Sequence, residues 1–286
     1  MTLFTNIKSF DKSFLLKLWL SLILYQLSVC PVSAQKDTMD IKDYILIINT
    51  YTESFPWSNR LISTATNFVK DDPKLAVYTE HMNMIMIDND SILDQFKDSL
   101  FDRYGSHCPR MLLLLGNSSL ILKDDLRKMW GDIPMVLCAG KDYTGPEHYY
   151  LTKQPIPLSE RVPLAELSQS CNLTYLYANL YIHENVEMMF RTLPRMKRFI
   201  YVGDERFVNQ VNSQEIQEIL RTKHPDVHYT FLSSRDIKKT NQLIDSLNFV
   251  DPRTTGILFS SWFHKRQFAG NMMLTMILPE IVSTVS

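Results

Sequence analysis

The chain has 286 residues, of which 45 % are hydrophobic and 21 % are charged, so it can bury one large core or two of medium size. Its formal net charge of -1 excludes the basic field that holds a phosphate backbone, and no stripe of lysines and arginines interleaved with aromatics occurs. We therefore expect a globular protein that does not bind nucleic acid.

The N-terminal segment 1–34 has the three parts of a secretory signal. Three lysines precede the apolar run from Leu18 to Val29, and the small residues Val32 and Ala34 follow it. This pattern predicts export, with cleavage after Ala34. A signal anchor counted from Phe14 is the alternative, because a spanning helix needs about 20 apolar residues.

Short apolar runs alternate with amphipathic stretches in residues 42–140. Because buried parallel strands are apolar throughout and are joined by helices, this alternation predicts a first lobe built on a parallel sheet. The expected strands are 44–50, 75–82, 111–116 and 134–140, and the expected helices are 58–70, 91–104 and 119–130.

The segment 141–170 is polar, contains four prolines and lacks a period, which indicates a connector. The alternation restarts in residues 171–286, which we predict to form a second lobe. In open parallel sheets, ligands lie beyond the carboxyl ends of the strands, so functional residues are sought there. The expected strands of this lobe are 173–178, 198–204, 227–232 and 255–261, and its expected helices are 184–193, 207–223, 236–247 and 271–285.

The chain stops at Ser286, inside or just after an expected helix and with no strand behind it. A two-lobe protein whose chain crosses back to its first lobe would continue with return strands. We therefore expect a fragment that ends before the return to lobe 1. The alternative is a natural end on a docked helix.

Motifs of cofactor and enzyme chemistry are missing from the sequence. Its eight glycines form neither a dinucleotide fingerprint nor a phosphate loop, and no nucleophile elbow occurs. The seven histidines do not form a metal-binding helical pair. We expect no cofactor, no metal site and no enzymatic activity.

Three cysteines follow the signal segment: Cys108, Cys138 and Cys171. They lack the spacing of a zinc site, and an odd number cannot pair completely. Buried free thiols are the favoured interpretation, and a disulfide between Cys108 and Cys138 is the alternative.

The stretch YILIINTYTESFPWSNRLI, beginning at Tyr44, resembles the first strand and loop of the substrate-binding-protein-like sensor domains of bacterial histidine kinases and hybrid two-component regulators. The similarity extends through VYTEHMN, where Asn83 stands in a place that is acidic in the family, and through DIPMVLCAGKDY. It continues to Ser260, Ser261 and Trp262, and covers about residues 42–285.

The resemblance implies an α/β fold of the two-lobed, type I periplasmic-binding-protein class, on the extracytoplasmic side of a bacterial inner membrane. It implies a small-molecule-sensing domain that signals by closure of its lobes, and a homodimer through the parent receptor. Contact with a membrane would come through the N-terminal segment or through a downstream region. The alternative function is a solute-binding protein that delivers its ligand to a transporter.

Candidate ligand-binding residues of the first lobe lie where its strands end. Tyr51, with Phe55 and Trp57, would form an aromatic wall, although Phe55 and Trp57 also suit a hydrophobic staple or the core. Asn117 could hydrogen-bond a polar ligand or cap a helix. Asp142, with Lys141, follows the fourth strand, and its alternative is a solvated turn.

The second lobe offers four candidates in corresponding places. Tyr181 follows the strand 173–178. Asp204 and Arg206 follow the next strand, where Asp204 could instead cap a helix and Arg206 could bind a ligand carboxylate or form a surface ion pair. Trp262 ends the last strand, and either the cleft or the core could hold it.

Overall fold

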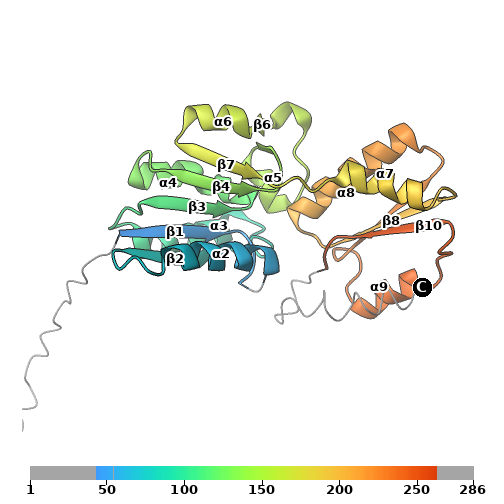
Figure 1. The fold of residues 1–286 in the computed structure, drawn as a ribbon, viewed down its shortest axis with the longest axis horizontal. Helices are drawn as coiled ribbons and strands as arrows, with labels where there is room; N and C mark the ends of the chain where they lie inside the picture. Colours follow the sequence, from blue (N-terminus) through green and yellow to red (C-terminus); the bar gives the residue numbers. More distant parts are fainter. Residues whose placement is uncertain (1–42, 54, 263–286) are drawn as a thin grey trace, which may run out of the picture. The chain divides into compact units, whose positions relative to one another are not determined.

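A computed structural model of the protein describes residues 43–53 and 55–262, and Figure 1 shows its fold. The predicted signal segment 1–34 and the predicted helix 271–285 lie outside these residues. The described residues form an α/β fold with two parallel sheets flanked by helices, as the alternation of apolar runs predicts.

The first sheet has five parallel strands in the order β2-β1-β3-β4-β7. Its central strands are apolar because both faces are covered, and they take the places that the sequence predicts. The strands are β1 (Asp43–Asn49), β2 (Leu75–His81), β3 (Met111–Leu115), β4 (Met135–Ala139) and β7 (Leu173–Tyr177). The helices between the first four are α2 (Pro56–Val69), α3 (Asp90–Tyr104), the 3-10 helix η1 (Asn117–Leu122) and α4 (Lys123–Trp130).

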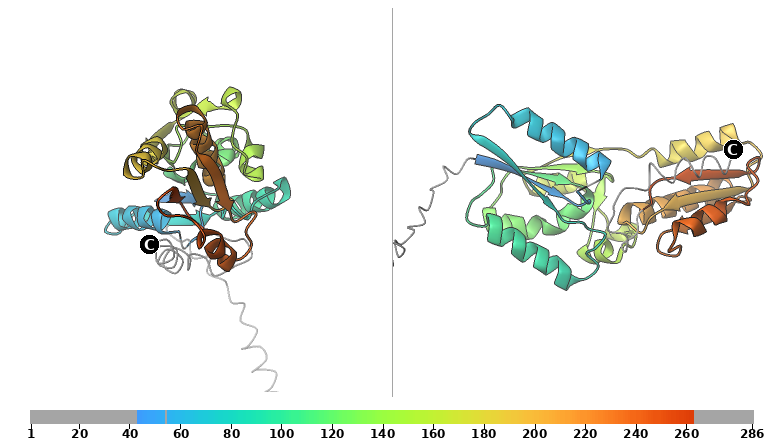
Figure 2. Two further views of the ribbon diagram at one scale, coloured as in Figure 1. Left: turned by 90° about the vertical axis from the view of Figure 1, so that its right-hand side faces the viewer. Right: turned by 90° about the horizontal axis from the view of Figure 1, so that it is seen from below.

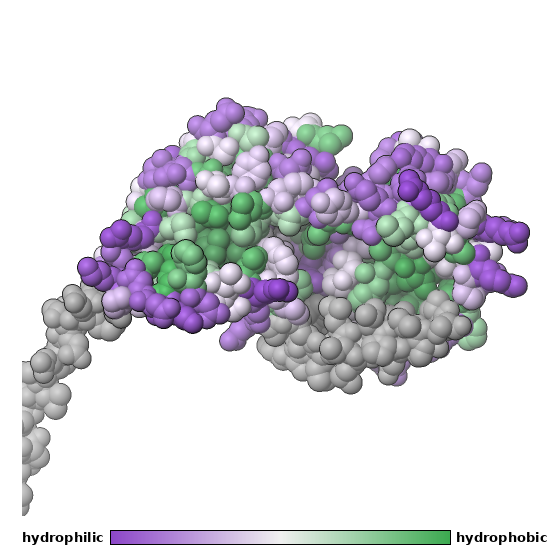
Figure 3. Space-filling view, viewed as in Figure 1, coloured by the Kyte–Doolittle hydropathy of each residue, from purple (hydrophilic) through white to green (hydrophobic). Residues whose placement is uncertain are grey.

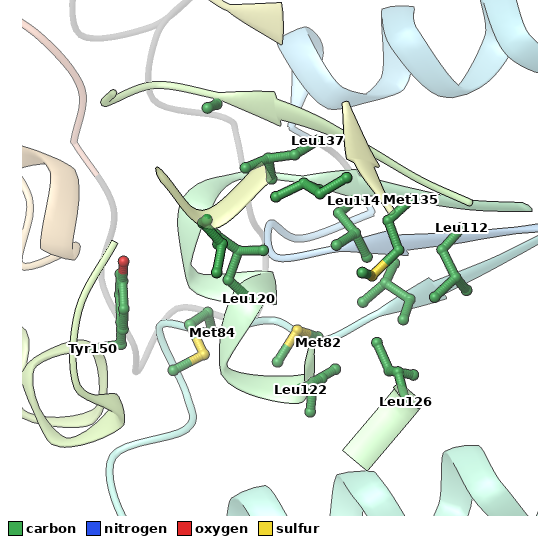
Figure 4. Close-up of a cluster of buried hydrophobic side chains, with 14 of the residues drawn as sticks. Met82, Met84, Leu112, Leu114, Leu120, Leu122, Leu126, Met135, Leu137 and Tyr150 are labelled. Atoms are coloured by element: carbon green, nitrogen blue, oxygen red, sulfur yellow. The ribbon is translucent and has the colours of Figure 1, made fainter. Parts of the chain in front are cut away.

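The two faces of this sheet bury different side chains of the same strand. Leu46 and Ile48 of β1 join the larger cluster, to which α3, η1 and α4 also contribute, and Figure 4 shows part of that cluster. Ile47 faces the other way, where Leu61 and Ile62 of α2 pack. Figure 2 shows α2 on one face of the sheet and α3 on the opposite face.

The predicted connector 141–170 is folded onto the first sheet. It contains β5 (Tyr143–Thr144), α5 (Glu147–Thr152), a 3-10 turn η2 (Leu158–Glu160), β6 (Val162–Pro163) and α6 (Leu164–Ser170). Tyr150 and Ile156 are fully buried in the cluster on the α3 face. Proline and polar residues dominate the sequence of this predicted connector, so its short helices and its buried apolar side chains are not evident from the sequence.

The strand 173–178 also differs from the prediction. We expect it to open the second lobe, but β7 pairs with β4 and forms an edge of the first sheet. Leu176 of this edge strand is 60 % exposed. Figure 3 shows hydrophobic residues at the surface over the first sheet.

The second sheet has three parallel strands in the order β10-β8-β9. In the central strand, Phe199 and Tyr201 face a cluster with α7 and α8, whereas Ile200 and Val202 face a cluster with α9. The elements are α7 (Ile182–Thr192), β8 (Arg198–Gly203), α8 (Phe207–Lys223), β9 (His228–Ser233), α9 (Thr240–Leu247) and β10 (Thr255–Phe259).

Gly116, directly after β3, has a φ of 93°, in the left-handed region that favours glycine. A Cβ atom there would overlap Thr50 Oγ1 and would lie 3.3 Å from the Tyr51 ring. Thr50 Oγ1 is held in place because it donates to the carbonyl oxygen of Leu115 at 2.8 Å. Gly116 therefore lets the turn after β3 lie directly against the loop after β1.

We expect Gly116→Ala to lower the free energy of unfolding by about 2–4 kcal/mol, because backbone strain and steric overlap add. The matched control is Gly131→Ala, where φ is 78° but a Cβ would meet nothing within 4 Å. The control variant should lower the free energy of unfolding by about 1 kcal/mol, because backbone strain alone applies to it. Urea denaturation measures both variants, and equal losses would show that the overlap with Thr50 is relieved at no cost.

Candidate functional site

A cavity that is open to solvent lies at the carboxyl ends of strands from both sheets. The sequence predicts functional residues at these ends, and that prediction is taken up below for each residue. Its lining residues are Thr50, Tyr51, Thr52, Phe55, Asn83, Met84, Ile85, Gly116, Asn117, Ser118, Gly140, Lys141, Lys153, Arg206, Phe207, Val208, Ser261 and Trp262. A neighbouring cavity, also open to solvent, shares Tyr51, Phe55 and Arg206 with it.

An aromatic stack forms the shared wall of the two cavities. The rings of Tyr51 and Phe55 are nearly parallel, at 13°, with their centroids 4.5 Å apart. The Arg206 guanidinium lies over the Phe55 ring, 4.8 Å from its centroid. A cation over an aromatic face is attracted by the ring's quadrupole, so this contact links the loop after β1 to the start of α8.

Asn49 shapes the loop that carries these aromatics. Its Oδ1 accepts a hydrogen bond from the backbone N–H of Tyr51 at 3.2 Å, which turns the chain directly after β1. Its Nδ2 donates to Ser58 Oγ at 3.2 Å in the first turn of α2. Helix α2 starts at Pro56, a residue suited to the first helical position.

Tyr51 keeps its phenolic proton at neutral pH. The pKa of its hydroxyl is raised, chiefly because the group is buried. The nearby charge of Arg206 lowers this pKa and the Asp204 carboxylate raises it, and the net shift is upward. Tyr51 therefore presents a hydroxyl that can both donate and accept, together with an apolar ring.

Arg206 is held by a fully buried carboxylate. Its Nε donates to Asp204 Oδ1 at 2.8 Å and its Nη2 to Asp204 Oδ2 at 2.7 Å, a two-pronged pair. Asn209 Nδ2 also donates to Asp204 Oδ1, at 2.7 Å. Burial raises the pKa of the Asp204 carboxyl, but the charge and hydrogen bonds of Arg206 outweigh burial, so the pKa lies below its ordinary value.

Asp204 does not line either cavity, so the structure places it behind Arg206 as the group that positions it. Its Oδ1 also accepts the backbone N–H of Arg206 at 3.1 Å, ahead of α8. The predicted contact of Arg206 with a ligand carboxylate would compete with this pair. The ion pair itself is buried, and the alternative of a surface ion pair does not apply.

Asn117 lines the cavity, but every hydrogen-bonding position of its side-chain amide already has a partner within the protein. Nδ2 donates to the carbonyl oxygens of Lys141 and Tyr143, both at 2.8 Å. Oδ1 accepts from the backbone N–H groups of Gly140 at 2.9 Å and Lys141 at 3.1 Å. An amide has two donors and two acceptor positions. Asn117 thus joins the turn after β3 to the turn after β4.

The two tryptophans differ in their placement. Trp262 is buried, with 4 % exposure, in the cluster with Leu243 and Leu247, and it also lines the cavity. Trp57 is 36 % exposed and lines the neighbouring cavity, with its ring 5.5 Å from that of Tyr51 in an edge-on arrangement. Trp262 therefore belongs both to the core and to the cavity wall.

Asp142 and Tyr181 are not among the residues that line either cavity. Asp142 is exposed, and its backbone carbonyl accepts a hydrogen bond from Leu164. Tyr181 is 57 % exposed and precedes α7 with a φ of 51°. The exposure of Asp142 matches its alternative, a solvated turn.

Sequence reasoning misses several lining residues. Asn83, Met84 and Ile85 follow β2, so the strand-end rule that singles out Tyr51 could have found them. Lys153 and Phe207 give no such signal, because they come from a segment interpreted as a connector and from a helix start.

The charged side chains that line the cavity, Lys141, Lys153 and Arg206, are all cations. Lys141 Nζ donates to Glu215 Oε2 of α8 at 2.8 Å, a second link between the two sheets' elements. Lys153, which is buried, donates from Nζ to the carbonyl oxygens of Ile87 and Tyr150. Within residues 43–53 and 55–262, no group of three or more His, Cys, Asp or Glu side chains is placed to hold a metal ion.

The cysteines Cys108, Cys138 and Cys171 are free thiols, so the alternative of a disulfide between Cys108 and Cys138 is not realised. Cys138 and Cys171 are buried, as expected, whereas Cys108 is exposed. Among the described residues, no helix combines the length and the hydropathy that a membrane span needs.

The fold and the cavity define an α/β protein with two parallel sheets and a hollow where strands of both end. No protein-family model matches the chain, and no curated protein matches its sequence. Among solved structures, it is similar to a conserved domain protein from Vibrio cholerae, with 13 % identity and a TM-score of 0.47, over 76 % of this chain and 64 % of that one.

Two further similar structures have 10 % identity. One is an ABC domain in complex with L-Trp from Streptococcus pneumoniae, with a TM-score of 0.47 over 85 % of this chain and 70 % of that one. The other is a carbohydrate transporter solute-binding protein from Agrobacterium radiobacter in complex with D-arabinose, with a TM-score of 0.44 over 77 % and 67 %. The chain spans less than two thirds of the Vibrio structure. At these identities the likeness concerns the fold and not the ligand.

Proposed function

We propose that residues 43–262 belong to a small-molecule-sensing domain of a two-component receptor, outside the cytoplasmic membrane, and that the cavity holds the ligand. The proposal rests on the cavity wall, to which strand ends of both sheets contribute aromatic and polar side chains. The resemblance of the stretch from Tyr44 to Ile62 to sensor domains of histidine kinases supports the signalling role.

The wall suits a mechanism of lobe closure in the type I periplasmic-binding class. Tyr51 and Phe55 come from the first sheet's loops, whereas Arg206 and Trp262 come from the second sheet's elements. A ligand that touches both sets is bound best in the arrangement that brings them together. It shifts the equilibrium toward that arrangement by its difference in affinity, and a dimeric receptor would transmit the shift across the membrane.

Binding, and not catalysis, is the proposed chemistry. Of the cavity's cations, Arg206 is paired with Asp204 and Lys141 with Glu215, so neither is poised as a base or nucleophile. Asn117, the polar side chain at the end of β3, is committed to backbone hydrogen bonds. The site residues that we propose for ligand contact are Tyr51, Arg206 and Trp262, with Trp57 at the neighbouring cavity.

A thermal-shift screen of the chain against sugars, amino acids, nucleosides and aromatic acids tests the proposal. We expect a saturable rise in melting temperature with one class, because a ligand at 100 times its Kd stabilises the folded state by about 2.7 kcal/mol. Tyr51→Ala and Trp262→Ala should each abolish the rise, measured against the variant's own melting temperature. Tyr181→Ala is the control, since Tyr181 lies outside both cavities, and it should keep the rise.

Two outcomes would redirect the proposal. No shift with any compound, in a folded chain, would favour a module that senses through a protein partner. A ligand response in a protein whose gene encodes no membrane helix and kinase module downstream would favour a carrier that delivers its ligand to a transporter.

A further inference from the structure

We propose that the cavity binds a small organic anion, a monocarboxylate with an apolar body and without an ammonium group, and that Arg206 donates a hydrogen bond to its carboxylate. The inference rests on the proposed function, because it names the class of ligand for the same cavity. It starts from the charges of the wall. The described residues that line the cavity include three cations, Lys141, Lys153 and Arg206, and no aspartate or glutamate.

Two of these cations belong to ion pairs whose carboxylates lie away from the cavity. Arg206 is paired with Asp204, which has no exposed surface, and Lys141 is paired with Glu215 of α8. Neither Asp204 nor Glu215 lines the cavity or its neighbour. A group inside the cavity is therefore nearer to the cation of each pair than to its carboxylate. The field of the wall favours a negative group over a neutral or a positive one.

Arg206 keeps a donor for a ligand while its pair with Asp204 stays intact. Its Nε and Nη2 atoms donate to Asp204, whereas Nη1 makes no hydrogen bond with the described residues. Nη1 is also not one of their buried atoms that lack a partner, and the side chain is 17 % exposed. A ligand carboxylate shares the charge of Arg206 with Asp204, but at Nη1 it displaces neither of the two hydrogen bonds. A charge-assisted hydrogen bond of this kind is stronger than a neutral one.

Lys141 adds to the positive field in the same way. Its Nζ atom has three donor hydrogens, and Glu215 is its one acceptor within the part of the chain that the structure describes. The Lys141 side chain is 10 % exposed and that of Glu215 is 40 % exposed, so water stabilises the carboxylate end of this pair. Because both pairs are neutral before a ligand binds, the single charge of a carboxylate suits the wall better than the higher charge of a phosphate ester.

The uncharged part of the wall suits an apolar ligand body. Phe55, Met84, Ile85, Phe207 and Trp262 bring rings and aliphatic chains to the cavity. An apolar body would bury its surface against them, and methionine adapts to its shape. Small-molecule sites commonly combine such a wall with a few polar groups that fix the orientation of the ligand. Here the carboxylate at Arg206 would fix it.

An ammonium group on the ligand would lack a partner of this kind. Among the described lining residues it would meet three cations and no carboxylate, and a cation that loses water without gaining a counter-charge is strongly unfavourable. We therefore expect an α-amino acid to bind more weakly than the same acid without its amino group.

Three probes of one shape test the inference by isothermal titration of the whole chain: 3-phenylpropionate, 3-phenylpropanamide and phenylalanine. The amide removes the charge of the acid, and phenylalanine adds an ammonium group to it. We expect 3-phenylpropionate to bind saturably at neutral pH. The amide and phenylalanine should each bind at least about tenfold more weakly, because the first loses the charge-assisted hydrogen bond and the second buries an unpaired cation.

The double variant Asp204→Asn/Arg206→Gln removes both charges together, so it leaves no buried charge without a partner. We expect it to bind the acid no more than about twofold more tightly than the amide. Glu218→Gln/Arg221→Gln is the matched control, because it removes an exposed, two-pronged pair from the same helix, outside both cavities, and it should keep the tenfold preference. The ratio of two affinities within one variant does not depend on that variant's stability.

Lys141→Gln is a second and milder test, because its partner Glu215 is already 40 % exposed and stays hydrated. We expect this variant to lower the preference for the acid over the amide about threefold, through the weaker positive field. Lys223→Gln breaks a comparable pair with Glu187, outside both cavities, and should leave the preference unchanged.

Two kinds of result would overturn the inference while leaving the cavity as a ligand site. One is binding of the amide or of phenylalanine that is as tight as that of the acid, or binding of a sugar or nucleoside when 3-phenylpropionate fails. The other is a preference for the acid that is unchanged in Asp204→Asn/Arg206→Gln or, if that variant does not fold, in Lys141→Gln. Failure of all three probes and of every compound of the thermal-shift screen, in a folded chain, would overturn the proposed function as well.

Discussion

Arg206→Ala is expected to lower the free energy of unfolding by about 3–5 kcal/mol, because it leaves a fully buried carboxylate without its counter-charge. Asp204 has no exposed surface, and the Arg206 side chain is 17 % exposed. The two hydrogen bonds between them, at 2.7 and 2.8 Å, are lost together, and so is the contact of the guanidinium with Phe55. Guanidinium chloride denaturation measures the change.

The control for this prediction is Arg221→Ala. Arg221 also donates two hydrogen bonds to one carboxylate, that of Glu218, but its side chain is 73 % exposed. Exposed pairs contribute little, so this variant should change stability by less than about 1 kcal/mol. If Arg206→Ala cost no more than Arg221→Ala, water would have to reach Asp204, and the description of a buried pair would be wrong.

The same pair predicts a dependence on pH. The pKa of Asp204 is lowered in the folded protein, so its contribution to stability is fully present above the unfolded pKa of about 3.9. That contribution is lost as the pH falls through the lower, folded pKa. In Arg206→Ala the buried Asp204 carboxyl lacks the cation that lowers its pKa, so the difference in stability between the two chains should shrink as the pH falls and this carboxyl becomes protonated in both, which melting curves at several pH values would measure.

Tyr150→Ala is expected to lower the free energy of unfolding by about 3–5 kcal/mol, through the cavity that it leaves. Tyr150 has no exposed surface, although it lies in the segment 141–170 that resembles a connector in sequence. Its ring packs against Phe207, at the start of α8, with the centroids 4.6 Å apart. Figure 4 shows Tyr150 with the other buried side chains of this core. Urea denaturation measures the change.

Tyr150→Phe separates the ring from the hydroxyl. The Tyr150 hydroxyl lies 3.0 Å from Thr144 Oγ1, so its removal should cost about 0.5–1.5 kcal/mol, the worth of one hydrogen bond. A loss in Tyr150→Ala no greater than in Tyr150→Phe would mean that the ring's packing contributes nothing.

The sequence predicts the first four strands well because their pattern has a simple physical cause. Strands such as β1 and β3 are covered on both faces, and continuous apolar runs follow from that burial. The same pattern does not say which sheet a strand joins, since β7 is as apolar as a strand of either sheet would be. Hence the strand 173–177 is predicted correctly while its sheet is not.

The sequence indicates which strand ends line the cavity, but not which hydrogen bonds and ion pairs their side chains make. Tyr51, Arg206 and Trp262, which strand ends single out, line the cavity, and their contact with a ligand stays a prediction. What a side chain does there depends on partners far away in the chain, which no local pattern reveals. The Asn117 side chain makes four hydrogen bonds with carbonyl and N–H groups of residues 140–143, whereas the buried Asn83 Oδ1 has no hydrogen-bond partner among the residues that the structure describes.

The strand pairings also have a consequence for how the chain folds during synthesis. Among the described strands, every pairing of the first sheet lies within residues 43–177, and every pairing of the second lies within residues 198–259. No described strand of either sheet pairs with a strand of the other. The strands of the N-terminal sheet can therefore all pair while later residues are still on the ribosome. The contacts of Arg206 with Phe55 and of Tyr150 with Phe207 would then form last, when the second sheet docks.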